Sequence, residues 1–284
     1  MQTSRIGASS AVPNAKHISD QAMLPLESGC AGVGCKDIVA AHTVGIPVHA
    51  VAARPGKAAV AVLEALLSAP RRPVLVTFAN PSTALLAQHA PRFARDLLAF
   101  DLVLPDGIGM CMAVRFLHGL PAGRVSFDMT SLAPHVFGHA QAGDLSIVLV
   151  GGAPGIAERA GGRLAATYPG LRISGALSGY GDVQDTMRQA AALEPDILVC
   201  GMGSIRQEAF LLGMRTRGWS GWGFTCGGFL DQLQGGLHYY PAWVNRAQLR
   251  WAYRLLREPG RLWRRYLIRY SQFAWRVCAA RVRR

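Results

Sequence analysis

Two stretches decide the fold of this chain: Phe100-Asp-Leu-Val-Leu-Pro-Asp-Gly-Ile-Gly109 and Asp196-Ile-Leu-Val-Cys-Gly-Met-Gly-Ser-Ile-Arg-Gln-Glu208. Each begins with a short apolar run that is typical of a buried strand, and each continues into glycines and polar residues that open a helix. In an open α/β sheet, ligands bind in the crevice at the carboxyl ends of the strands. The carboxylate of Asp106 would then face guanidinium, amide and carboxylate groups from 206–208. This pattern predicts a site for a polar, phosphorylated substrate and favours an enzyme over a scaffold.

Strand-like and helix-like segments alternate outward from these stretches, which predicts an α/β fold with a parallel sheet and helices on both faces. The strands are expected at 73–79, 100–104, 145–150, 171–175, 196–200 and 222–226. The helices are expected at 56–69, from 80–82 to about 90, and at 108–117, 154–167, 183–193 and 204–217. After Pro241 only helical patterns follow.

The length of 284 residues allows one large domain with an appendage. Residues 1–45 are rich in Ala, Gly, Ser and Pro without a sustained period, and we expect a flexible N-terminal extension there. Residues 46–243 are expected to form the catalytic domain, and 244–284 a basic helical appendage. Half of all residues are hydrophobic, so a large core is expected.

Positive charge is concentrated at the C-terminal end. Residues 244–284 hold twelve Arg and one acidic residue, Glu258, which leaves +2 of the net +13 for the preceding 243 residues. Such a block attracts phosphates of membranes or of nucleic acid. Trp, Tyr and Phe are interleaved with the arginines, as in helices that lie at a membrane surface. We therefore expect an anionic membrane surface, and no nucleic acid, as the partner of this segment.

The expected cellular location depends on two kinds of segment that we do not find in the sequence, a signal peptide and a transmembrane helix. The first twenty residues have no apolar signal-peptide core, and no run of eighteen apolar residues could form a transmembrane helix. The six cysteines (30, 35, 111, 200, 226 and 278) show no zinc-site spacing, and we expect them to be buried, reduced thiols. These absences predict a cytoplasmic protein whose attachment to a membrane is peripheral.

Each candidate site residue also has a purely structural explanation. The turn Gly151-Gly-Ala-Pro-Gly155 could bind a phosphate at a helix N-terminus or could simply need glycine. Asp106 could be a general base or the N-cap of a helix. Gln207 and Glu208 suit a first helical turn whatever the function, and Asp231 could cap a helix or contact a sugar hydroxyl.

Absent motifs narrow the chemistry further. There is no Asp-x-Asp, His-Glu-x-x-His, P-loop or Gly-x-Ser-x-Gly, and the glycine spacing at 151–155 is not the dinucleotide fingerprint. A nicotinamide oxidoreductase is therefore disfavoured. If the substrate is a sugar nucleotide, no metal or other cofactor is expected, and arginines would neutralise its diphosphate.

The ordered set of motifs from about 75 to 270 resembles the WecG/TagA/CpsF glycosyltransferases, glycosyltransferase family 26, and in particular members from exopolysaccharide clusters. The matching segments are Asn80-Pro81, 101–109, 148–157, 168–173, Gly179-Tyr180, 196–203, 206–208, Gly227-Gly-Phe229 with Asp231, and 251–259. The resemblance implies a Rossmann-like domain with a C-terminal appendage that aids membrane association and completes the active site. It also implies inverting, metal-independent transfer of a sugar from a UDP-sugar to a polyprenyl-diphosphate-linked saccharide, with the protein peripheral on the inner face of the plasma membrane.

Carried over by position, the resemblance makes Asp106 the general base, Asn80 a pocket residue beside it, and Gln207 a polar catalytic residue. Expected substrate-binding residues are Gly107, Gly109, Gly151, Gly152, Tyr180, Gly201, Gly203, Arg206, Glu208, Gly228, Asp231, Arg250, Arg254 and Arg257. Of these, Arg206 and the three tail arginines would stabilise the departing diphosphate.

The chain departs from the family signature Pro-Lys-Gln-Glu, because Ile205 stands in place of proline and Arg206 in place of lysine. It also has His238-Tyr-Tyr-Pro241 where many members have Arg-Ala-Pro. N-acetylmannosamine is therefore not assumed as the donor sugar, and a homo-oligomer is left open. The alternative is a non-catalytic lipid- or nucleic-acid-binding protein with a degenerate nucleotide pocket.

Overall fold

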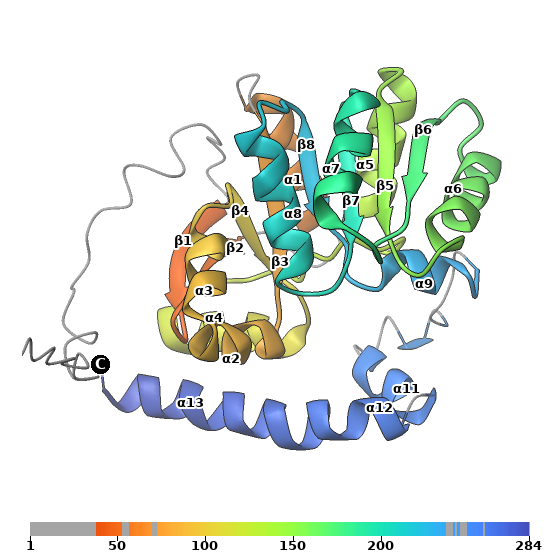
Figure 1. Cartoon of the computed structure of the whole chain (residues 1–284). Coiled ribbons are helices and arrows are strands. Elements are labelled where there is room, and N and C mark those ends of the chain that lie inside the picture. The colour runs from red at the N-terminus through yellow and green to blue at the C-terminus, as the bar shows by residue number, and fades with distance from the viewer. Residues whose placement is uncertain are drawn as a thin grey trace, which may run out of the picture.

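The computed structural model describes residues 38–52, 57–69, 73–236, 241, 243–244, 249–257 and 259–283, and its centre is a six-stranded parallel sheet (Figure 1). The strand order is β4-β3-β8-β7-β5-β6. The strands are β3 (Val74–Ala79), β4 (Leu102–Pro105), β5 (Ser146–Gly151), β6 (Arg172–Leu177), β7 (Ile197–Gly201) and β8 (Trp222–Thr225). The predicted α/β class and parallel sheet are confirmed.

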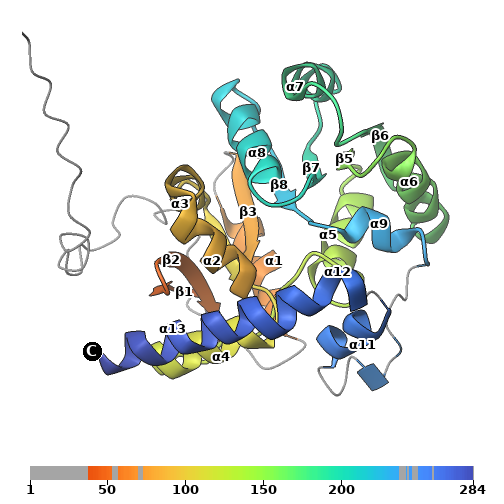
Figure 2. The same ribbon diagram turned by 60° about the horizontal axis from the view of Figure 1, so that its bottom comes forward.

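Helices cover both faces of this sheet. They are α1 (Ala58–Ser68), α2 (Pro81–His89), α3 (Pro91–Leu98), α4 (Ile108–His118), α5 (Leu132–Ala142), α6 (Ile156–Thr167), α7 (Val183–Ala192), α8 (Arg206–Thr216) and α9 (Phe229–Leu233). Helices α1, α5 and α6 lie on one face, and α7 and α8 lie on the other (Figures 1 and 2).

The sheet separates two apolar clusters because successive side chains of a strand point to opposite faces. In β5, Ile147 and Leu149 join the cluster under α1 and α5, whereas Val148 and Val150 join the cluster under α7 and α8. All four side chains are fully buried. A parallel sheet buried on both faces needs such continuous apolar runs, which is why the sequence located these strands.

A hairpin of β1 (Ile38–Thr43) and β2 (Ile46–Val51) lies partly within 1–45, so at least 38–45 is ordered strand and turn where a flexible N-terminal extension was predicted. The rest of that extension, 1–37, lies outside the described residues. The hairpin covers β4, the edge strand of the large sheet: the backbone N–H of Val103 donates to His49 Nδ1 at 2.9 Å. Edge strands need such cover because their unpaired backbone groups invite association.

Burial lowers the pKa of His49 to about 4, so the imidazole is neutral and accepts from Val103 at neutral pH. Below the ordinary pKa of 6.5 the unfolded chain takes up a proton that the folded chain does not, and stability falls until pH 4. We expect a loss of about 3 kcal/mol over this window. In urea unfolding from pH 7 to pH 4, His49→Gln should flatten this slope, whereas His89→Gln, exposed on α2, should leave it unchanged.

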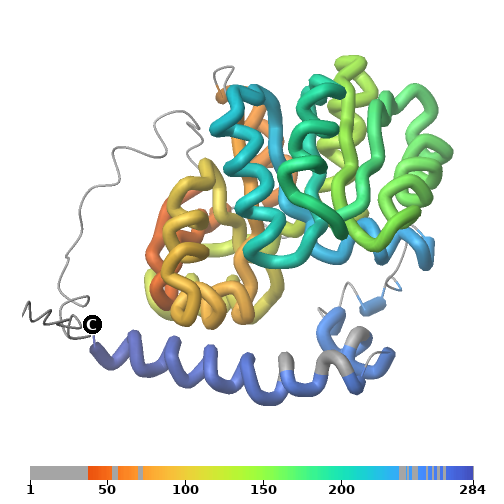
Figure 3. The backbone as a smooth tube through the Cα atoms, in the orientation of Figure 1, coloured from red at the N-terminus to blue at the C-terminus, as the bar shows by residue number. Residues whose placement is uncertain are grey.

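In the part of the C-terminal segment that the structure describes, the regular elements are helices, as predicted after Pro241. They are α11 (Arg250–Arg257), α12 (Pro259–Trp263), the π-helical turn η2 (Arg264–Arg269) and α13 (Tyr270–Val282). In Figures 1 and 3 this segment runs beneath the edge of the sheet where the strands end. Helix α13 packs on α2 and α4 through Phe273 and Val277. None of the helices within the described residues is both long and apolar enough to span a bilayer.

Candidate active site

Asp106 lies at the carboxyl end of β4, and its backbone N–H donates to the carbonyl of Ala79 at the end of β3, at 2.8 Å. Gly107 follows with a φ of +85°, a backbone conformation that suits glycine, and begins α4. The N-cap of α4 is Gly107 and has no side-chain cap, so the alternative in which Asp106 caps the helix is wrong. The Asp106 side chain is 34% exposed and therefore open to a substrate.

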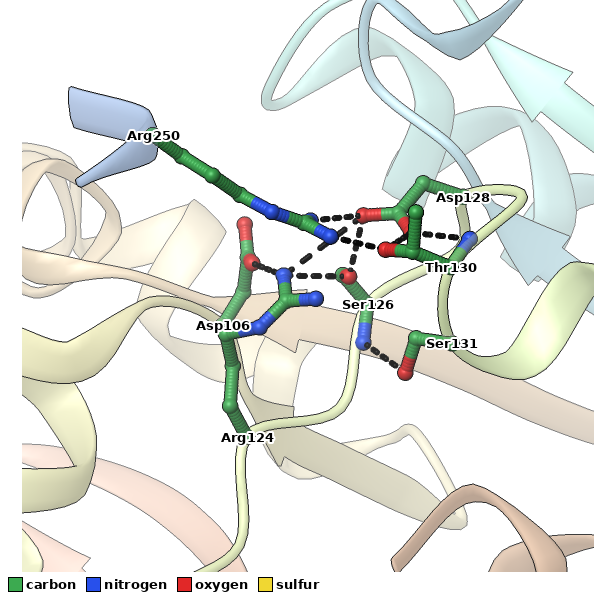
Figure 4. A network of polar contacts seen from close by, with 7 residues as sticks. All are labelled: Asp106, Arg124, Ser126, Asp128, Thr130, Ser131 and Arg250. Carbon is green, nitrogen blue, oxygen red and sulfur yellow. Dashed lines mark hydrogen bonds and ion pairs between the residues drawn. The ribbon is translucent and has the colours of Figure 1, made fainter. Parts of the chain in front are cut away.

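Arg124 lies between Asp106 and a second carboxylate, Asp128 (Figure 4). Its Nη1 atom is 3.6 Å from Asp106 Oδ1 and 3.5 Å from Asp128 Oδ2, and it donates to Ser126 Oγ at 2.7 Å. Ser126 Oγ in turn donates to Asp128 Oδ2 at 2.6 Å. Arg124 thus places a positive charge beside both carboxylates.

Asp128 also connects the catalytic domain to the C-terminal segment. Arg250, the first residue of α11, donates to Asp128 Oδ2 at 2.8 Å and to the hydroxyl of Thr130 (Figure 4). Burial raises the pKa of Asp128, but the attraction of Arg124 and Arg250 outweighs it and leaves the pKa at about 2. The predicted residues Asp106 and Arg250 are thus joined through Arg124 and Asp128.

Neither Arg124 nor Asp128 was predicted as a site residue, although the sequence carries a signal for both. The segment Arg124-Val-Ser-Phe-Asp128 alternates polar and apolar residues, as one extended stretch with two faces would. Val125 and Phe127 are buried, and Phe127 packs against the rings of Phe78, Phe137, Phe224 and Phe229. This aromatic anchor leaves the polar residues on the other face, toward Asp106.

Removing the charge of Asp128 should release the C-terminal segment. In Asp128→Asn the two arginines face each other without a shared anion, and we expect a loss of about 2 kcal/mol of stability. Trypsin should then cleave near Arg250 at least tenfold faster, as followed by mass spectrometry of the fragments. Asp185→Asn, which removes an exposed ion pair with Arg188, should leave cleavage unchanged, and equal rates in both variants would contradict the predicted link.

Asn80 caps α2 from the end of β3, next to the strand that leads to Asp106. Its Oδ1 accepts from the backbone N–H of Ser82 at 2.9 Å and of Thr83 at 3.3 Å. Capping therefore occupies Oδ1 and fixes the side chain at the carboxyl edge of the sheet. The predicted contact of Asn80 with substrate remains a prediction.

Gln207 and Glu208, in the first turn of α8, point into the protein and are nearly inaccessible to solvent. Glu208 accepts from the Thr77 hydroxyl at 3.1 Å, from Gln207 Nε2 at 2.9 Å and from the backbone N–H of Ile205 at 2.7 Å. Burial raises the pKa of the Glu208 carboxyl. Gln207 Oε1 accepts from the Gly227 N–H at 3.2 Å, so this pair fixes the loops that follow β7 and β8.

Gly151 and Gly201, predicted to bind substrate, allow neighbouring loops to touch. A Cβ atom on Gly151 would lie 2.4 Å from the carbonyl oxygen of Gly201, and one on Gly201 would lie 2.7 Å from that of Gly227. Larger residues cannot occupy these positions without moving the backbone. This packing requirement explains both glycines, and a contact with phosphate stays a prediction.

The other predicted residues lie along the same edge of the sheet, following β4, β5, β6, β7 and β8. Arg206 is exposed at the start of α8, and Tyr180 and Asp231 are exposed after β6 and in α9. The remaining glycines 107, 109, 152, 203 and 228 lie in turns or first helical turns after the strands. Three strand spacings separate β4 from β7, roughly 14 Å, so Asp106 and Arg206 could contact different parts of one extended ligand.

The other two predicted tail arginines, Arg254 and Arg257, differ in what the structure describes of them. Arg257 is exposed, and its guanidinium lies 5.2 Å from the ring centre of Tyr253. Arg254 belongs to α11, but its side chain lies outside the described part of the chain. His238, Tyr239 and Tyr240 also lie outside it. Arg250 is the predicted tail arginine that the described contacts place at the site.

The cysteines fit the expectation of free thiols with one correction. Cys111, Cys200 and Cys226 are buried and free, and burial raises the pKa of the Cys111 thiol to about 12. Cys278 is exposed rather than buried, because it lies on the outer face of α13. Cys30 and Cys35 are outside the described residues. Among the residues that the structure describes, no three His, Cys, Asp or Glu side chains gather as a metal site requires.

Comparison with known proteins matches the Glycosyl transferase WecG/TagA/CpsF family over residues 41–284. One relative is the UDP-Gal:alpha-D-GlcNAc-diphosphoundecaprenol beta-1,4-galactosyltransferase of Shigella boydii, 28% identical over 202 residues, or 70% of this chain and 83% of the relative. Another is the N-acetylglucosaminyldiphosphoundecaprenol N-acetyl-beta-D-mannosaminyltransferase of Bacillus subtilis (strain 168), 28% identical over 68% of this chain and 75% of the relative. The protein of the same name from Bacillus spizizenii is 30% identical over 68% of this chain and 74% of the relative.

Proposed function

This chain belongs to the WecG/TagA/CpsF glycosyltransferase family, and from that premise we propose that it transfers a sugar from a UDP-sugar to a saccharide on a polyprenyl diphosphate. The transfer inverts the configuration at the anomeric carbon and needs no metal ion. It serves the synthesis of an exopolysaccharide or other cell-surface polysaccharide. The observation that carries the proposal is the extent of the family match. It spans the residues around Asp106 and continues through the C-terminal segment that Arg250 connects to them.

Asp106 takes the proton of the acceptor hydroxyl as that oxygen bonds to the anomeric carbon of the donor sugar. The bond between the anomeric carbon and the diphosphate oxygen breaks at the same time, and UDP leaves as an anion. Arg124 holds the Asp106 carboxylate in place on one side. Arg206, exposed at the positive N-terminal end of α8, supplies a cation for the departing diphosphate.

The names of the relatives guide the choice of substrates. Both kinds of relative act on N-acetylglucosamine linked to undecaprenyl diphosphate, so this acceptor is the first to test. Their transferred sugars differ, galactose in one and N-acetylmannosamine in the other, and the donor therefore has to be identified by experiment. Both names specify a β product, and forming a β linkage from an α-linked nucleotide sugar requires inversion.

The test is transfer from a panel of radiolabelled UDP-sugars to N-acetylglucosaminyl-diphosphoundecaprenol, with EDTA present throughout. Label that enters the lipid fraction identifies the donor, and NMR of the released disaccharide gives the anomeric configuration. Transfer that is absent in EDTA and appears once Mg²⁺ is added in excess of the EDTA would overturn metal independence. A related glycosyltransferase that uses the same acceptor preparation serves as the positive control. If that enzyme transfers sugar and this chain transfers none from any donor, the alternative of a non-catalytic binding protein is favoured.

We also place the protein in the cytoplasm, peripheral on the inner face of the plasma membrane. The support is the composition of the C-terminal helices, in which exposed aromatic residues such as Trp251 and Trp263 alternate with arginines. Each basic residue near an anionic surface contributes about 1 kcal/mol, so part of the net charge of this segment suffices for reversible binding.

A further inference from the structure

Helix α4 carries a row of large apolar side chains that remain exposed to solvent over about half of their surface in the described structure. Ile108, Met112 and Phe116 are all exposed, with Met112 at 62%, and their spacing of four residues places them on one face. The opposite face is buried in the core through Met110, Val114 and neighbours. We call Ile108, Met112 and Phe116 the α4 stripe.

Helix α13 lies beside α4 and presents a second apolar row. Figure 2 shows the two helices running side by side, and the guanidinium of Arg281 on α13 lies 5.8 Å from the ring centre of Phe116. While Phe273 and Val277 face the catalytic domain, Trp275 is 70% and Val282 is 87% exposed. Residues 275 and 282 are two helical turns apart and share the outward face.

Arginines border both rows. Arg276 and Arg283 lie on one side of the Trp275–Val282 row of α13, and Arg281 lies between that row and the α4 stripe. An apolar strip bordered by cations is what an anionic bilayer accommodates, with side chains among the acyl chains and guanidinium groups at the headgroups. A second copy of this chain would instead bring two cationic borders together, which is unfavourable.

The α4 stripe also begins at the candidate active site. Gly107 alone separates Asp106 from Ile108, and the stripe extends about 12 Å from there along the helix. A bilayer that receives this stripe would therefore meet the protein next to the carboxylate that acts on the acceptor.

We propose that the α4 stripe inserts into an anionic lipid bilayer beside the outward face of α13, and that this insertion holds Asp106 at the membrane surface where a lipid-linked acceptor presents its sugar. The inference deepens the proposed function and rests on it for the acceptor. It assigns to the catalytic domain, rather than to the C-terminal segment alone, a direct contact with lipid.

The experiment uses the full chain and vesicles of phosphatidylcholine with about one third phosphatidylglycerol. Met112→Glu places a charge in the middle of the stripe, and we expect at least a tenfold weaker partition in co-sedimentation. Met112→Leu keeps the apolar surface and should bind like the unmodified chain. Leu67→Glu makes the same kind of change at an exposed position near the end of α1, at the opposite edge of the sheet, and should also bind normally.

Two acceptors separate membrane contact from catalysis: a short-chain, water-soluble N-acetylglucosaminyl diphosphate lipid, and the undecaprenyl form embedded in the vesicles. We expect Met112→Glu to transfer normally to the soluble acceptor and at least tenfold more slowly to the embedded one. Equal vesicle binding by Met112→Glu and Leu67→Glu would overturn the inference. An equal loss of transfer rate by Met112→Glu on the soluble and the embedded acceptor would overturn it as well. Failure of the unmodified chain on both acceptors would refute the proposed function, while the vesicle partition would still test the stripe.

Discussion

Asp106→Asn should lower the rate of sugar transfer by about 10²–10⁴-fold while leaving the protein folded, because an amide has the shape of the carboxylate but does not accept the proton. The kcat should carry nearly all of the loss, since proton transfer occurs in the transition state and not in the bound complex. Stability should change little, because the ion pair with Arg124, at 3.6 Å with Asp106 one-third exposed, is screened by solvent.

The matched control is Asp144→Asn, the same chemical change in a loop just before β5, at the opposite edge of the sheet. Transfer by this variant should equal that of the unmodified chain. Calorimetric binding of UDP should be unchanged in both variants, which separates a lost base from a damaged site. Full transfer by Asp106→Asn would exclude Asp106 as the base.

The second large effect is expected at Ile205, where proline would restore the family signature yet should destabilise this chain. Ile205 has a φ of +77°, a conformation closed to proline, whose ring fixes φ near −65°. Proline also lacks the backbone N–H that Ile205 donates to the buried Glu208 carboxylate at 2.7 Å. The distorted loop and the lost charged hydrogen bond should together cost about 3–5 kcal/mol.

Ile205→Gly serves as the control, because glycine adopts positive φ without strain and keeps the N–H. Urea unfolding should show a midpoint for Ile205→Pro well below that of the unmodified chain, and a midpoint for Ile205→Gly close to it. A proline variant as stable as the unmodified chain would show that the loop before α8 adopts a different backbone conformation.

A positive φ at a β-branched residue strains the backbone and is uncommon away from functional sites. The position of Ile205 directly before Arg206 fits this tendency.

The sequence located all six strands of the parallel sheet and most of the helices between them. The strands around Val148 and Leu198 are buried on both faces and read as unbroken apolar runs. The elements that escaped detection are β1, β2, α3, α5 and α9. The hairpin of β1 and β2 depends on contact with β4, including the bond from Val103 to His49, and such a contact has no local signature.

For the site, sequence alone placed Asp106, Arg206 and the glycine-bearing turns at the carboxyl edge of a parallel sheet, because motif order and the alternation of strands and helices depend on local patterns. Only the tertiary structure decided which charges meet. Arg124 stands between Asp106 and Asp128, and Arg250 reaches the same carboxylate from 122 residues away. The tertiary structure also directs Gln207 and Glu208 into the protein interior. It places α13 beside α4. Periodicity fixes the face of an element that is buried, but pairing between distant side chains depends on how the chain closes on itself.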